Sequence, residues 1–196
     1  MDRAELERLS ERALSVEEVA SSLLDRCGVG AREGRPHEDW IWLCLLELWQ
    51  RWWPERVCVE FLGDKIQARY DALKRREAVS AAAIWLDAWS DVVRLCDLTG
   101  IDSIGEFDDR FSMYQSLFNW SQDLEDALCN AGREDAQFLR ARIAVCEEAL
   151  RRFPDENGLM VENRRRAVAE SYVELGGTDK AEALFEQWLD ADPRWG

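Results

Sequence analysis

Hydrophobic residues recur every three or four positions over most of this chain, which is the period of an amphipathic α-helix. The clearest stripe, from Ile84 through Ala88 and Val92 to Leu95, begins after a capping serine at position 80 and ends before Gly100. Strict alternation typical of strands is missing. The pattern therefore predicts an all-α fold with about nine helices, joined by short connections and packed as antiparallel hairpins.

Three segments of the chain differ in character. Residues 1–35 predict a helical pair followed by a loop, residues 36–132 a tryptophan-rich helical region, and residues 133–196 helical hairpins. Within the central region, the helix predicted between Pro36 and Pro54 is apolar nearly all round, so we expect it to be central and buried. A later helix is expected to run from about Phe111 to Gly132.

The net charge of the chain argues against some classes of binding partner. The chain has 25 basic and 40 acidic residues, for a net charge of −15, which argues against binding to nucleic acid or to an anionic membrane surface. The charged N-terminus lacks the apolar core of a secretory signal, and no apolar run approaches the roughly 20 residues of a membrane span. We expect a cytoplasmic protein, and the strong preference for arginine over lysine is typical of a GC-rich bacterial genome.

Cysteine and histidine offer little for metal or nucleophilic chemistry. The six cysteines include no C-x-x-C pair and lie among apolar helical positions, which predicts reduced core thiols rather than structural zinc ligands. His37 is the only histidine, so sites with two histidines are excluded within this chain. A Cys–His dyad would need His37 to meet Cys27 or Cys44, and a capping or surface role at a helix start is the simpler expectation. We name no catalytic residue, cofactor site or metal site.

The C-terminal helix pair carries the one specific motif. Tyr172, then Ala181 and Phe185 in an A-x₃-F arrangement, and then Pro193 follow the order of a 34-residue helix–turn–helix signature. Residues from about 160 to 196 thus resemble a tetratricopeptide repeat and are similar to uncharacterised bacterial proteins of that kind, some of which also carry a SEC-C zinc motif. The closely spaced cysteines of that motif are missing here, so no zinc site is carried over.

The resemblance implies a tetratricopeptide-like α-solenoid or irregular helical array that binds a protein or peptide partner in a groove lined by first helices. The groove candidates are Arg164, Arg165 and Arg166, because guanidinium groups bind carboxylates bidentately. Alternatively, these arginines form a solvated face near a helix start. The chain ends where a following helix would begin, so we expect a piece of a longer protein or an end covered by another surface.

Acidic residues leave two alternatives to a scaffold or adaptor open. A partner docking on Asp123, Glu125 and Asp126 would carry positive charge, as expected for an acidic inhibitor of a basic protein surface. Asp87 and Asp91 lie one helical turn apart, and with help from another helix they could hold Mg²⁺ in a metal-dependent hydrolase, as could the carboxylates that follow Asn119. The sequence favours a non-enzymatic protein-interaction module over both.

Overall fold

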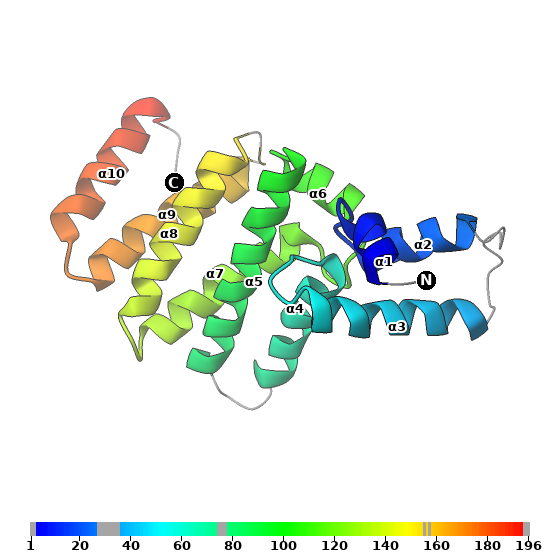
Figure 1. Ribbon diagram of the computed structural model, residues 1–196. Coiled ribbons are helices and arrows are strands. Elements are labelled where there is room, and N and C mark those ends of the chain that lie inside the picture. Colours follow the sequence, from blue (N-terminus) through cyan, green and yellow to red (C-terminus); the bar gives the residue numbers. More distant parts are fainter. Residues whose placement is uncertain (1–2, 27–35, 74–77, 155, 157, 194–196) are drawn as a thin grey trace. The chain divides into compact units, whose positions relative to one another are not determined.

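A computed structural model describes residues 3–26, 36–73, 78–154, 156 and 158–193 (Figure 1). Every regular element in these ranges is a helix, so the all-α prediction is confirmed. Ten helices are present there: α1 Arg3–Ser10, α2 Val16–Arg26, α3 Pro36–Trp52, α4 Val59–Leu73, α5 Ala78–Thr99, α6 Ile104–Arg110, α7 Leu117–Gly132, α8 Gln137–Arg152, α9 Gly158–Glu174 and α10 Thr178–Ala191. In the described ranges, none has an apolar stretch long enough to cross a lipid bilayer. The chain forms two compact units, residues 1–64 and 65–196.

The helix expected from about Phe111 to Gly132 begins only at Leu117, as α7, and residues 111–116 separate it from α6, so that prediction was wrong at its start. The Asp108 carboxylate accepts hydrogen bonds from the backbone N–H groups of Leu117, at 2.5 Å, and Phe118, at 3.2 Å. Ser116 Oγ accepts a further bond from the N–H of Asn119 at 3.2 Å. These acceptors satisfy N–H groups that a helix start leaves unpaired, so α7 begins anew after α6 ends.

In the first unit, α1, α2 and α3 enclose a small core. Its buried members include Leu6, Val19, Leu45 and Trp49. The Glu60 carboxylate, at the start of α4, accepts hydrogen bonds at 2.9 Å from the first two backbone N–H groups of α2. This long-range cap fixes the start of α2 against the start of α4.

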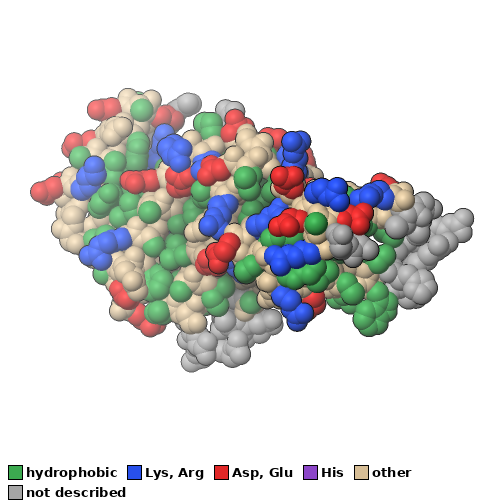
Figure 2. Space-filling view, in the orientation of Figure 1, with side chains coloured by type: hydrophobic (Ala, Val, Ile, Leu, Met, Phe, Trp, Pro, Cys, Tyr) green, Lys and Arg blue, Asp and Glu red, His purple; other side chains and the backbone are tan. Residues whose placement is uncertain are grey.

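Helix α3 is not buried all round, so the expectation of a central helix was wrong. Leu45 and Trp49 face the core, whereas Trp40 is 66% exposed and Leu43 is 46% exposed. Hydrophobic atoms accordingly show on the surface over this helix (Figure 2). Cys44 is also exposed, contrary to the expectation of a core thiol. The side chains of residues 36–39, including His37, and residue Cys27 lie outside the described part of the chain.

The second unit contains a run of helices in which α7, α8, α9 and α10 each pack against the next in chain order (Figure 1). The 22-residue helix α5 packs on α7, where the buried ring of Trp85 meets that of Trp120 edge-on with centroids 6.0 Å apart. Between α8 and α9 the core consists of Ile143, Cys146, Ala167 and Val168.

The α9–α10 hairpin forms where the C-terminal motif predicts it. Gly176 has a φ of +81°, a left-handed conformation that favours glycine, and the N–H of Gly177 donates to the carbonyl of Tyr172 at 2.7 Å. Ala181 is fully buried on α10, which lets that helix approach α9 closely. The two-helix interpretation of this segment is confirmed, with α10 bounded as expected.

Candidate functional site

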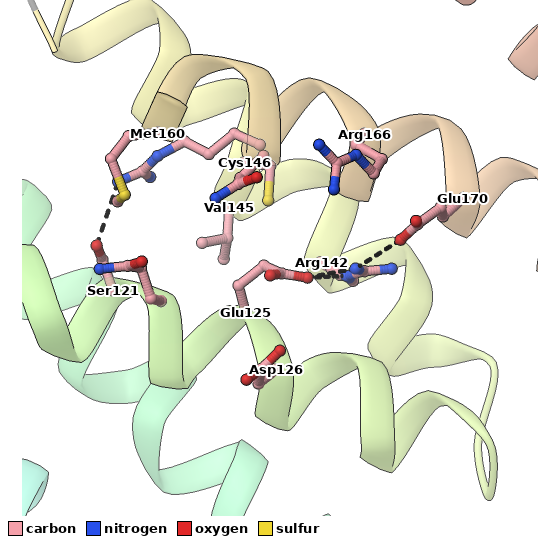
Figure 3. Close-up of a pocket in the computed structure, with 12 residues that line it drawn as sticks. Ser121, Glu125, Asp126, Arg142, Val145, Cys146, Met160, Arg166 and Glu170 are labelled. Atoms are coloured by element: carbon pink, nitrogen blue, oxygen red, sulfur yellow. Dashed lines mark hydrogen bonds and ion pairs between the residues drawn. The ribbon is translucent and has the colours of Figure 1, made fainter. Parts of the chain in front are cut away.

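A pocket of about 370 Å³ lies between α7 and α9, with α8 as its floor (Figure 3). It arises because α7 and α9 both pack on α8, so their side chains face each other across it. We call this pocket the α7–α9 trough. It is lined by Ser121, Gln122, Glu125 and Asp126 of α7, by Arg142, Val145 and Cys146 of α8, and by Met160, Asn163, Arg164, Arg166 and Glu170 of α9.

Arg142 connects the three helices of the trough. It is only 4% exposed, and its guanidinium donates to the Glu125 carboxylate from α7. It also donates to Glu170 Oε2 and to Ser171 Oγ of α9, both at 3.2 Å. Figure 3 shows the Glu125 and Glu170 carboxylates reaching toward Arg142 from opposite walls. A buried arginine with this many charge-assisted bonds fixes the geometry of the pocket.

The burial of Glu125 has an electrostatic consequence. Burial raises the pKa of Glu125, and the adjacent guanidinium of Arg142 offsets only part of that rise. The negative charges of Asp126 and Glu170 raise the pKa of Glu125 further. Glu125 and Glu170 therefore share one buried guanidinium, and Asp126 adds a further negative charge that acts on Glu125.

Arg164 ties α9 to α7 at the other end of the trough. It is 5% exposed, and its Nη2 donates to Ser121 Oγ at 3.2 Å and to Glu156 Oε1 at 2.8 Å. Burial raises the pKa of Glu156, an effect that the Arg164 charge opposes. The alternative that residues 164–166 form one solvated face is thus wrong for Arg164.

The other two candidate arginines occupy different surroundings. Successive helical residues point roughly 100° apart, so three in a row cannot share a face. The Arg165 guanidinium lies over the ring of Trp188, 5.8 Å from its centroid. Arg166 is exposed at the trough. The structure does not bring the three arginines together.

The three acidic candidates on α7 also lie in different surroundings. Asp123 accepts a hydrogen bond from the hydroxyl of Tyr70 on α4, away from the trough. Glu125 points to Arg142, and Asp126 is exposed where it lines the trough. Two of the three acidic candidates therefore belong to the pocket, together with two of the three candidate arginines, Arg164 and Arg166.

Asp87 and Asp91 both form salt bridges with Lys65. Lys65 Nζ lies 2.6 Å from Asp87 Oδ2 and 2.5 Å from Asp91 Oδ2, so an ammonium group sits between the two carboxylates. Among the described residues, no three His, Cys, Asp or Glu side chains are arranged to hold a metal ion.

Lys65→Met should lower the free energy of unfolding by about 1 to 2 kcal/mol, because the mostly buried Asp91 then loses its nearer charge partner and keeps the more distant Arg94, at 3.9 Å. Urea denaturation monitored by circular dichroism measures this loss. Lys180→Met, at an exposed position on α10, is the matched control and should change stability by less than about 0.5 kcal/mol. Equal losses in the two variants would show that the Lys65 bridge contributes nothing.

The buried cysteines are poor nucleophiles. Burial raises the pKa of Cys96 to about 11 and that of Cys146, at the floor of the trough, to about 12. Both stay protonated at neutral pH, whereas the thiolate is the reactive form. For these two residues, the prediction of core thiols is confirmed.

The remaining trough residues supply neutral hydrogen-bonding groups and apolar contacts. Gln122 and Asn163 bring amide groups that both donate and accept, and Val145, Cys146 and Met160 bring apolar surface. Such a lining can bind a molecule that is itself part polar and part apolar, as a polypeptide is.

No protein-family model, curated protein or solved structure matches this chain. The likeness to a tetratricopeptide repeat therefore depends on the motif residues alone.

Proposed function

We propose that this protein is a protein-interaction module, and that it binds a segment of a protein or peptide partner in the α7–α9 trough. The observation that carries the proposal is the trough itself, a polar pocket between two helices that lie on a common third helix. Its volume of about 370 Å³ falls within the range of ligand-binding pockets, and its lining is mostly polar, with Val145, Cys146 and Met160 as its apolar residues.

The helix order supports a tetratricopeptide-like arrangement. If α7–α8 and α9–α10 are successive hairpins, then α7 and α9 are the first helices, which line the groove in that family. The trough lies between those two helices. Tyr172 and Leu184 pack on the α8–α9 core, as a helix–turn–helix unit that buries one face requires.

The walls of the trough are held firmly enough to bind without much rearrangement. Arg142 joins α8 to both neighbours, and Arg164 joins α9 to α7. Binding to a preformed site avoids the free-energy cost of ordering the site. Asn163 and Gln122 then offer the amide groups that suit a peptide backbone.

The geometry gives less support to the metal-dependent hydrolase. Two of its candidate ligands, Asp87 and Asp91, already pair with Lys65. A cation would have to displace that ammonium group before it could bind.

Filling the trough tests the proposal. Asn163→Trp places a large ring in the pocket and should weaken partner binding at least about tenfold, which is about 1.4 kcal/mol. A partner is first identified by affinity capture from the source cells and then titrated as a purified protein by calorimetry.

Val173→Trp is the matched control, because Val173 is exposed on α9 and does not line the trough. It should leave the dissociation constant within about twofold of the wild type. If Asn163→Trp folds normally and binds every captured partner as the wild type does, the trough is not the binding site.

A further inference from the structure

The guanidinium of Arg164 carries a buried hydrogen-bond donor that the protein leaves without an acceptor. Arg164 lines the trough and is 5% exposed. Its Nη2 donates to Ser121 Oγ and to Glu156 Oε1. The Nε of the same guanidinium is buried and donates to no acceptor within the described ranges. Buried donors are nearly always paired in folded proteins, so this N–H indicates an acceptor that comes from outside the chain.

The other buried arginine of the trough is fully paired by comparison. Each of the three guanidinium nitrogens of Arg142 donates a hydrogen bond: Nε to Glu125, Nη1 to Ser171 and Nη2 to Glu170. A ligand would have to break one of these bonds before it could bind to Arg142. The Nε of Arg164 can accept a ligand without such a loss.

The charge around this donor favours an uncharged acceptor. Arg164 Nη2 lies 2.8 Å from Glu156, whose side chain is 2% exposed, so a buried carboxylate already balances the charge of Arg164. A second carboxylate at Nε would leave two buried negative charges beside one guanidinium. The charged residues that line the trough are balanced as well, namely Arg142, Arg164 and Arg166 against Glu125, Asp126 and Glu170. A carbonyl oxygen would complete the bonds of Arg164 without adding charge.

The burial of the Nε favours a side chain of the partner over its main chain. A main-chain carbonyl has the chain on both sides, whereas a side-chain amide can insert its tip into a pocket. Figure 3 shows Met160 and Ser121 at one end of the pocket and Glu170 at the other. Met160 lies one helical turn before Arg164 on α9, so the two side chains share a helix face. The flexible thioether of Met160 can move to admit the amide.

We infer that the trough binds the side-chain amide of a glutamine in the partner segment, and that the carbonyl oxygen of this amide accepts a hydrogen bond from Arg164 Nε. The methylene groups of the glutamine would lie on Val145 and Cys146, and its NH₂ group would donate to the amide oxygen of Gln122 or Asn163. The inference depends on the proposed function, because it names the side chain that the same pocket selects. The ligand is uncharged, whereas the sequence suggests a carboxylate for residues 164–166.

Small capped amino acids test this preference on the full chain without a known partner. The probe is Nα-acetyl-glutamine methylamide, and the norleucine and glutamate counterparts with the same caps are the apolar and acidic references. NMR follows the side-chain Nε–H signal of Arg164, which through-bond correlation to the Arg164 backbone assigns. The glutamine probe should shift this signal and should bind at least about threefold more tightly than either reference. Added salt should change its affinity by less than about twofold, because the ligand is uncharged.

A matched pair of variants locates the hydrogen bond. Arg164→Lys keeps a positive charge beside Glu156 but removes the Nε donor, so it should weaken binding of the glutamine probe at least about threefold. Arg165→Lys makes the same exchange at the next residue, whose guanidinium lies over Trp188 and does not line the trough, and it should leave binding unchanged. Backbone signals of residues 121–126 and 160–170 report binding to both variants, and circular dichroism confirms that both fold.

Three results would overturn the inference: an Arg164 Nε–H signal that the glutamine probe does not move, equal or tighter binding of either reference, and unchanged binding to Arg164→Lys. Equal binding of all three probes would show that the trough recognises their common main-chain amides, which would leave the proposed function intact. Partner binding that survives Asn163→Trp would instead remove the proposed function.

Discussion

Replacing Arg142 with methionine should lower the free energy of unfolding by about 3 to 5 kcal/mol, because it leaves the partly buried Glu125 carboxylate without its partner. Bonds to Glu170 and Ser171 are lost as well. Urea denaturation followed by far-ultraviolet circular dichroism measures the change. Arg140→Met, at an exposed position on the same helix, should cost less than about 0.5 kcal/mol.

The loss of unfolding free energy caused by Arg142→Met should also depend on pH. Burial already raises the pKa of Glu125, and loss of the guanidinium raises that pKa further. A carboxyl with a raised pKa in the folded state binds its proton more tightly there. The resulting stabilisation is complete below the unfolded pKa and is lost as pH rises through the folded pKa. The deficit should therefore shrink as pH falls from neutral toward the ordinary pKa of glutamate.

Adding Glu125→Gln to Arg142→Met separates charge from packing. The amide removes the unpaired buried charge, so this double variant should recover much of the lost stability and should lose the pH dependence. A deficit that is constant with pH, or a double variant no more stable than Arg142→Met, would show that Arg142 acts only by filling space.

Trp120→Ala should cost about 3 to 5 kcal/mol of unfolding free energy, because it leaves a cavity in the core of the second unit. Trp120 is fully buried, with its ring centroid 6.0 Å from that of Trp85 and 6.4 Å from that of Trp89. The same urea titration, followed by circular dichroism, measures the loss.

A second variant, Trp120→Phe, tests whether the indole N–H of Trp120 contributes to stability. The indole Nε1 of Trp120 is buried and has no hydrogen-bond partner among the residues that the structure describes, so phenylalanine removes no bond. It should cost about 1 to 2 kcal/mol, from lost ring volume alone. If phenylalanine costs as much as alanine, the indole N–H is bonded in solution.

The helical periodicity was sufficient to predict the elements of the C-terminal region. The motif from Tyr172 through Ala181 placed the α9–α10 hairpin, because glycines at the turn and a small residue at the crossing leave a local trace in the sequence. The start of α7 left a weaker trace. Its N-cap is Ser116, but the hydrophobic period continues across that serine, and the other acceptor of its first N–H groups, Asp108, lies nine residues before Leu117.

Helix α3 shows a second limit of pattern analysis. Apolar residues all round predict burial only if neighbours exist to cover every face, and that depends on how many helices pack there. In the first unit α3 buries Leu45 and Trp49 and leaves Trp40 exposed. The sequence specifies the apolar surface but does not specify what covers it.

The trough was only partly predictable for a related reason. Arginine is rarely buried, so residue type alone places Arg142 and Arg164 on the surface. Their partners Ser171 and Ser121 lie 29 and 43 positions away in the chain, and only the packed helices bring them together. The position of Arg164 could have indicated its burial. It lies one helical turn after Met160 and one turn before Val168, so it falls within an apolar stripe.

Hydrogen–deuterium exchange on the full chain, with and without a purified partner selected by its dependence on Asn163, tests the central claim most directly. We expect slower amide exchange confined to residues 121–126 and 160–170, the two walls of the trough. Slower exchange confined to other helices, with these two segments unchanged, would contradict a binding site between α7 and α9.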